Sequence, residues 1–284
     1  MKYLIIPDVH NRFELVEKII NRVKPDLTIF LGDFFDDFHD NPLIIEEVAC
    51  WFKESIHKKD RIHLCGNHDV HYWFKDNKKI RCSGYEDIKS IRINDIITTK
   101  EWEKLKFYYV LDNKWLLSHA GVHPSWVNDN FSSSKLNFAK PSKVIGKLRR
   151  DSIEVVRKLY AGDEHWFVRA GFSRSLLARN YGGLLWCDWR EEFMPIIGIN
   201  QIVGHTPQRS VDWINVAEGD SKYNVFPLKD SNVVITAGDS YIFDPRHNLS
   251  EKSSYNLCLD THPGSQYYAT YEEGLLTIHE SSNI

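Results

Sequence analysis

The sequence predicts an α/β fold in which a parallel sheet carries helices on its faces. In the first third of the chain, short apolar runs of strand length alternate with helical patterns, and the connections between them are short. The last fifth is rich in strand-length runs separated by turn signals. The chain has 284 residues, 42% of them hydrophobic and 26% charged, which is the composition of a globular protein with a substantial core.

The first third predicts a β-α-β-α-β order. Residues 2–6 form an apolar run that indicates a buried strand. Phe13, Val16, Ile20 and Val23 recur at helical spacing, so we expect a helix over residues 12–23, which Pro25 ends. The pattern continues with a strand at 27–31, a helix at 43–52 and a strand at 62–65.

The remainder is less regular. A strand is predicted at 115–118, and residues 124–183 are rich in helix formers, serine and charge, with the best helix at 143–160. No linker interrupts the chain, so we expect a single domain over residues 1–284 with a partly helical insertion at about 124–183. Further strands are predicted at 184–186, 202–203, 233–236, 257–259, 267–271 and 275–279, the last two joined by a turn at Glu273-Gly274.

Composition argues against several classes of partner. The formal net charge is −3, so no bulk basic field exists to bind nucleic acid non-specifically. The apolar runs are far shorter than the ~20 residues of a membrane span, and the N-terminal run is too short for a signal peptide. Five scattered cysteines without a CxxC pair indicate free thiols in a reducing compartment, so we expect a cytoplasmic protein.

Polar residues that carry chemistry follow the predicted strands. In an open α/β sheet the carboxyl ends of the strands meet at one crevice, where ligands bind. Glycines beside several of these residues would let the backbone approach a bound ion or phosphate closely. The clusters are Asp8-Val9-His10, Gly32-Asp33-Phe34-Phe35-Asp36, Gly66-Asn67-His68-Asp69, His119-Ala120-Gly121 and Gly204-His205-Thr206-Pro207.

These residues form a nitrogen and oxygen ligand set without thiolate. Such a set suits hard or borderline divalent ions, such as Mn, Fe, Zn or Mg. Each cluster alone could be an ordinary helix cap, turn or loop histidine, because short motifs produce many false positives. Five clusters in order, each after a predicted strand, favour a metal site.

The clusters resemble the motifs of the calcineurin-like metallophosphoesterases. The similarity is greatest to the phosphoprotein phosphatase branch, which includes bacteriophage lambda phosphatase and bacterial symmetrical diadenosine tetraphosphate hydrolases. The family motifs GDxHG, GDxxDRG, GNHE/D, HAG and GHTP correspond to the five clusters, and Leu259-Asp260-Thr261 is a partial echo of a late LDTG motif. The resemblance implies a metallophosphoesterase-type β-sandwich flanked by helices, and it covers residues 1–70, 115–125, 184–208 and 256–275.

The resemblance further implies a two-metal centre. Asp8 and His10 would hold one ion, Asp33 would bridge both, and the second ion would be held by Asn67, His119 and His205. We expect two divalent ions, manganese first, with Fe, Zn, Mg or Ni as alternatives. Metal-bound hydroxide would attack phosphorus directly. His68, paired with Asp36, would protonate the leaving oxygen.

One departure from the family pattern concerns the phosphate-binding arginine. Asp37 stands where the second motif has arginine, so another cation must hold the phosphate. Arg190 is our first candidate, since residues 185–190 resemble a family segment with a phosphate-binding arginine, and Arg12 is the second. The alternative for Arg190 is a surface salt bridge with Glu191 or Glu192.

The expected function is hydrolysis of a phosphomonoester, on a phosphoprotein at serine or threonine or on a small molecule. Thr206-Pro207 follows His205, whereas many nucleases of the wider superfamily have a second histidine there. A symmetrical hydrolase of diadenosine tetraphosphate or a related nucleotide is one alternative. The other, favoured by Asp37, is a non-catalytic binding protein on a degenerate phosphatase fold.

Overall fold

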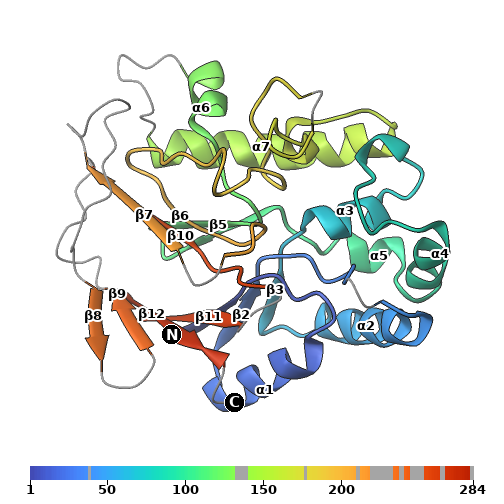
Figure 1. Cartoon of the computed structure of the whole chain (residues 1–284), viewed down its shortest axis with the longest axis horizontal. Coiled ribbons are helices and arrows are strands. Elements are labelled where there is room, and N and C mark those ends of the chain that lie inside the picture. Colours follow the sequence, from blue (N-terminus) through green and yellow to red (C-terminus); the bar gives the residue numbers. More distant parts are fainter. Residues whose placement is uncertain are drawn as a thin grey trace.

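Two β-sheets are stacked face to face in the computed structural model, with helices on the outer surface of each sheet (Figure 1). This arrangement confirms the predicted α/β sandwich. The structure describes residues 1–37, 40–131, 140–175, 178–208, 212–217, 233–236, 240–243, 253–262 and 266–281.

The seven-stranded sheet combines the N-terminal strands with the C-terminal ones. β1, β2 and β3 are parallel, as predicted, and β11 pairs antiparallel with β1. Glu273 and Gly274 between β11 and β12 both have positive φ (51° and 86°), which confirms the predicted hairpin turn. The order is β3 (Arg61–His63), β2 (Leu27–Phe30), β1 (Lys2–Ile6), β11 (Tyr267–Glu272), β12 (Leu275–Glu280), β9 (Ser240–Phe243) and β8 (Val233–Thr236).

The five-stranded sheet has a parallel centre. β5, β6 and β10 run in the same direction, and an antiparallel strand lies at either edge. The order is β4 (Tyr108–Leu111), β5 (Trp115–Ser118), β6 (Asn200–Val203), β10 (Ser253–Cys258) and β7 (Asp212–Ala217).

Helices cover the outer faces of the two sheets, and the helices between residues 67 and 102 lie to one side of both sheets (Figure 1). They are α1 (Phe13–Val23), α2 (Pro42–Ser55), α3 (Asn67–Trp73), α4 (Asp87–Ile96), α5 (Thr99–Trp102), α6 (Pro124–Asn130) and α7 (Pro141–Tyr160), with 3₁₀ turns η1 (Lys78–Ile80) and η2 (Trp166–Val168). In α7, Val144, Leu148, Val155 and Leu159 form a buried stripe at helical spacing. None of the described helices combines the length and apolarity that crossing a bilayer requires.

The side chains of β1 show why its sequence is apolar throughout. Leu4 and Ile6 pack with Val16 and Ile19 of α1, whereas Ile5 points into the core between the two sheets. Both faces of the strand are therefore buried, and a strand buried on both faces needs no polar alternation.

The predicted strand at 184–186 is wrong. The backbone N–H groups of Trp186 and Cys187 both donate to the carbonyl of Gly183, at 2.9 and 3.0 Å, so this segment is a turn. β5 pairs directly with β6, which leaves no place for a strand between them. Leu184 and Leu185 are fully buried, and an apolar run of this length can be buried without being a strand.

Candidate metal centre and catalytic site

The predicted ligands lie on loops that leave the carboxyl ends of parallel strands in both sheets. Asp8, Asp33 and Asn67 follow β1, β2 and β3 of one sheet, while His119 and His205 follow β5 and β6 of the other. Hydrogen bonds join the two sets of loops. His119 Nδ1 lies 3.1 Å from the Leu31 carbonyl, and the backbone N–H of His205 donates to Asp8 Oδ1 at 3.0 Å. The loops of the two sheets therefore meet at one site.

The ligand atoms form two clusters with one member in common. Donor atoms of Asp8, His10 and Asp33 all lie within 4.8 Å of one another, and so do those of Asp33, His119 and His205. The structure therefore brings the carboxylate of Asp33 to both groups.

Asn67 joins the second cluster. Its Oδ1 lies 2.9 Å from His119 Nε2 and 2.8 Å from His205 Nδ1, and the two imidazole nitrogens are 3.2 Å apart. His119 Nδ1 donates to the Leu31 carbonyl, so its Nε2 is the ring atom directed at the amide oxygen of Asn67. Burial acts to lower the pKa of His119, but the charges of Asp33 and Asp8 outweigh it and raise the pKa to about 9. An amide oxygen and two ring nitrogens that converge in this way fit a bound cation, which would replace the proton on His119.

The backbone at the site is strained. His10, Asp33, Asp36 and His205 all have left-handed φ angles, of 45°, 48°, 64° and 69°. Residues other than glycine rarely adopt this conformation, and it recurs where function fixes the geometry. No motif in the sequence revealed these left-handed conformations.

Glycines make close approaches between the ligand loops possible, whereas the sequence led us to expect that they admit a bound ion or phosphate. A Cβ on Gly66 would lie 2.1 Å from Asp33 Oδ1, and a Cβ on Gly204 would lie 2.0 Å from Asp8 Oδ1. Real side chains do not come this close, so a methyl group at either position must displace the carboxylate.

We therefore expect Gly204→Ala to weaken metal binding by about 10- to 100-fold, the range for residues that support metal ligands. Metal affinity can be measured by titrating metal-free protein with Mn²⁺. Gly146→Ala in α7 is the matched control, because only the end of the Arg150 side chain lies within 4.0 Å of the added Cβ. Unchanged Mn²⁺ affinity in Gly204→Ala would show that the position of Asp8 is unimportant for binding.

Electrostatics at the site also fit a cation. Burial raises the pKa of Asp8 well above its ordinary value, and the charges of Asp260 and Asp33 raise it further. Asp260, which follows β10, is buried too, and its pKa is raised mainly by burial. A divalent ion would offset this repulsion between carboxylates. The sequence assigned Asp260 no role, although the partial late motif at 259–261 marked its position.

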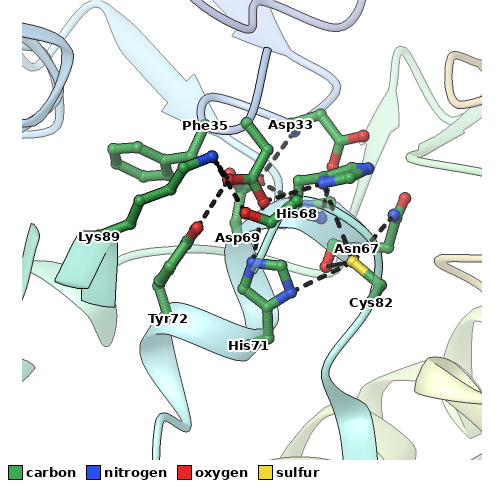
Figure 2. Close-up of polar contacts among 12 residues, drawn as sticks. Asp33, Phe35, Asn67, His68, Asp69, His71, Tyr72, Cys82 and Lys89 are labelled. Atoms are coloured by element: carbon green, nitrogen blue, oxygen red, sulfur yellow. Dashed lines mark hydrogen bonds and ion pairs between the residues drawn. The ribbon is translucent and has the colours of Figure 1, made fainter. Parts of the chain in front are cut away.

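His68 and Asp36 are paired as predicted. His68 Nδ1 lies 3.0 Å from Asp36 Oδ2, and the backbone N–H of His68 donates to Asp33 Oδ1 at 2.9 Å (Figure 2). Burial acts to lower the pKa of His68, but the charge of Asp33 and the bond to Asp36 outweigh it and raise the pKa well above its ordinary value. The direction of this shift favours the protonated imidazole.

Asp69 is a buried residue whose role the sequence did not reveal. Its carboxylate accepts hydrogen bonds from the backbone N–H groups of Asp33, Phe34 and Gly66, at 2.8, 2.8 and 2.7 Å. The loop after β2 is thereby tied to the loop after β3. Asp69 thus fixes the position of Asp33 without joining either cluster of ligand atoms.

The two predicted phosphate-binding arginines lie in different surroundings. Arg12 is half-buried, and its Nη2 donates to the Asp8 carbonyl at 3.0 Å. Arg190 is exposed, and its Nε donates to Gln208 Oε1 at 3.2 Å. Within the described residues Arg190 forms no ion pair with Glu191 or Glu192, so that alternative is not observed.

Arg174 is a cation near the site that the sequence did not single out. Its Nη2 lies 2.6 Å from Asp188 Oδ2. Burial, followed by the charges of His119 and Arg174, holds the pKa of His205 well below its ordinary value, a direction that favours the neutral imidazole that metals bind.

A third group of potential ligands lies elsewhere, at Asp151, Glu154 and His165. Lys147 and Lys158 already pair with its two carboxylates. His165 Nδ1 accepts the backbone N–H of Phe167, which leaves the proton of the neutral imidazole on Nε2. These contacts favour a structural cluster over a metal site.

The model of the family described as calcineurin-like phosphoesterase matches residues 1–209. No curated protein matches the chain.

Three solved structures are similar at low identity. A metallophosphoesterase from Sphaerobacter thermophilus has 15% identity and a TM-score of 0.44, covering 99% of this chain and 87% of that one. A putative diadenosine tetraphosphatase has 14% identity and a TM-score of 0.43, covering 100% and 95%. A serine/threonine phosphatase from Saccharomyces cerevisiae has 13% identity and a TM-score of 0.47, covering 99% and 79%. Likenesses this distant do not identify a substrate.

The family match spans more than two thirds of the chain and includes the loops that carry the five motifs. It confirms the family that these motifs predict. The chain belongs to the calcineurin-like phosphoesterases and is a hydrolase that acts on phosphoester bonds.

Proposed function

We propose that the chain is a phosphomonoesterase that requires two divalent metal ions and acts on phosphorylated proteins or small phosphomonoesters. The observation that supports this most strongly is the position of Asp33, whose carboxylate belongs to both clusters of ligand atoms. A carboxylate shared by two groups of donors can hold two ions at the short separation, ~3.5–4 Å, that two-metal hydrolysis requires.

In this proposal Asp8, His10 and Asp33 hold one ion, while Asp33, Asn67, His119 and His205 hold the other. The mixed oxygen and nitrogen donors favour manganese over softer ions. When bound, the ions supply an activated water nucleophile and neutralise charge on the phosphate.

His68 acts as the general acid. Asp36 binds its Nδ1, which leaves Nε2 free to face the substrate and to pass a proton to the leaving oxygen. The raised pKa of His68 supports this assignment, since an acid must hold its proton until the bond to phosphorus breaks. Asp36 orients the imidazole and stabilises its charge.

Arg12 is the cation that we favour for binding phosphate oxygens. Its guanidinium bonds to the backbone of Asp8, beside the first cluster, and its Nε is buried without a partner among the described residues. Arg190 would contribute a second positive charge from the exposed rim of the site.

Asp37 does not belong to either cluster of ligand atoms, and its carboxylate lies 3.8 Å from His262 Nε2.

We further propose that residues 1–284 form a single domain and that about 124–183 is an insertion. Pairing of β11 with β1 and of β10 with β6 supports the single domain, because C-terminal strands complete sheets that earlier strands begin. The free thiols of all five cysteines are compatible with a reducing compartment, and we propose the cytoplasm.

Metal dependence tests this function. Protein stripped of metal should be inactive, and Mn²⁺ should restore hydrolysis of p-nitrophenyl phosphate and a phosphoserine peptide. At 100 times its Kd, a bound ion should add about 2.7 kcal/mol of stability, a rise in Tm of roughly 4–5 °C for a chain of this size. Cleavage of diadenosine tetraphosphate alone would replace the monoester by a dinucleotide substrate. No metal-dependent turnover on any of the three would favour the binding-protein alternative.

A further inference from the structure

The carboxylate of Asp36 is surrounded by four polar side chains, two at each oxygen. Oδ2 faces the imidazoles, with His68 Nδ1 at 3.0 Å and His71 Nε2 at 3.1 Å. Oδ1 accepts hydrogen bonds from Tyr72 Oη at 2.6 Å and from Lys89 Nζ at 3.1 Å (Figure 2). Tyr72 and Lys89 thus contact the oxygen of Asp36 that does not face His68, the proposed acid. Neither Tyr72 nor Lys89 belongs to a motif of the sequence.

Lys89 is a buried lysine whose bonding capacity is fully used. The residue is 6% exposed, on α4, and its ammonium donates to Asp36 Oδ1, to Asp40 Oδ2 at 2.5 Å and to the Gly84 carbonyl at 3.0 Å. An ammonium has three protons, and each has a partner here. One positive charge thus links the loop after β2 to the segment before α4.

The backbone at Gly84 closes the remaining side of Asp36. A Cβ on Gly84 would lie 2.9 Å from Asp36 Cγ, and Gly84 has a φ of +90°. Asp36 itself has a left-handed φ of 64°. Lys89 binds both Asp36 and the Gly84 carbonyl. It therefore holds the Asp36 carboxylate and the backbone of Gly84, which packs against it, in a fixed relative position.

We propose that Lys89 is a positioning residue for phosphoester hydrolysis: by holding Oδ1 of Asp36 it keeps Oδ2 against Nδ1 of His68, so that Nε2 of His68 stays directed at the leaving oxygen. This inference rests on the proposed function, in which His68 is the acid. Without Lys89, the carboxylate has one anchor fewer on Oδ1 and can rotate away from the imidazole, and Asp40 loses its buried counter-ion.

A purely structural role predicts a different result. A lysine that only neutralises two buried carboxylates would, when removed, lower stability and depress turnover of all substrates alike. A positioning lysine acts on proton donation. When it is removed, the fall in kcat must therefore be larger for a substrate whose leaving group needs a proton. Phenyl phosphate has a poor leaving group and p-nitrophenyl phosphate a good one, so the ratio of their kcat values separates the two roles.

The test uses Lys89→Met, which preserves length and removes the charge, in the Mn²⁺-loaded enzyme. We expect kcat for phenyl phosphate to fall at least about 10-fold, kcat for p-nitrophenyl phosphate to fall much less, and both KM values to stay near wild type. In an Asp36→Asn background Lys89→Met should cause no further change in the kcat ratio, since residues that act through one another are not additive. Lys147→Met, which removes the partner of buried Asp151, is the control and should leave the ratio unchanged.

Tyr72→Phe gives a second measurement that does not depend on the folding of Lys89→Met. It removes the other hydrogen bond to Oδ1 and should change the kcat ratio in the same direction. Equal losses on both substrates, or a full additional change of the ratio in Asp36→Asn, would overturn the inference while leaving the proposed function intact. Wild-type protein without metal-dependent turnover would overturn the proposed function and this inference with it.

Discussion

Asp33→Asn should lower kcat by about 10³-fold at saturating Mn²⁺, an effect of roughly 4 kcal/mol on the barrier and the largest that we expect from a single substitution. Asparagine preserves size but loses the negative charge and one of the two oxygens that can bind metal. Because Asp33 belongs to both clusters, the proposed two-ion site would lose a ligand to each ion, not only to one. Initial rates on p-nitrophenyl phosphate and metal content after dialysis measure the effect.

Asp37→Asn is the matched control. It removes a carboxylate from the same loop at a residue outside both clusters. We expect its kcat to stay within a few-fold of wild type. If the two variants lost equal activity, the loss would reflect the charge of the loop, and the special position of Asp33 would be disproved.

His68→Ala should show the second largest effect, and that effect should depend on the substrate. General acid catalysis contributes at least about 10²-fold, and we expect a loss of about this size on phenyl phosphate, whose leaving oxygen needs a proton. Hydrolysis of p-nitrophenyl phosphate should fall much less, because nitrophenolate leaves without one. A plot of log kcat against leaving-group pKa for several aryl phosphates should be steeper for the variant.

His57→Ala controls for the loss of an imidazole, since the His57 side chain is 45% exposed and pairs with Glu101 at 3.0 Å, not with the site. It should leave the slope of that plot unchanged. Parallel plots for wild type and His68→Ala would contradict the role of His68 as acid.

The positions of the proposed metal ligands were predictable because each follows an apolar strand. Strand ends are visible in a sequence, and the geometry of stacked parallel strands then brings Asp8, Asp33 and His119 together. The left-handed backbone of Asp33 was not predictable, since it depends on hydrogen bonds between loops, such as those that Asp69 accepts from Asp33 and Phe34.

The features that could not be predicted depend on which side chains the fold buries. Helix α3 has no amphipathic stripe, because its polar residues Asn67, Asp69 and His71 are buried to serve the site. Residues 184–186 show the reverse, an apolar run buried in a turn. Lys89 looks like any surface lysine in the sequence, and only the fold reveals that it is buried against Asp36.

Anomalous diffraction from crystals grown with Mn²⁺ tests the two-ion proposal most directly. The proposal predicts two anomalous peaks about 3.5–4 Å apart, each marking a manganese ion bound by the carboxylate of Asp33. One peak alone, or peaks that do not contact Asp33 and lie instead at Asp151, Glu154 and His165, would contradict it.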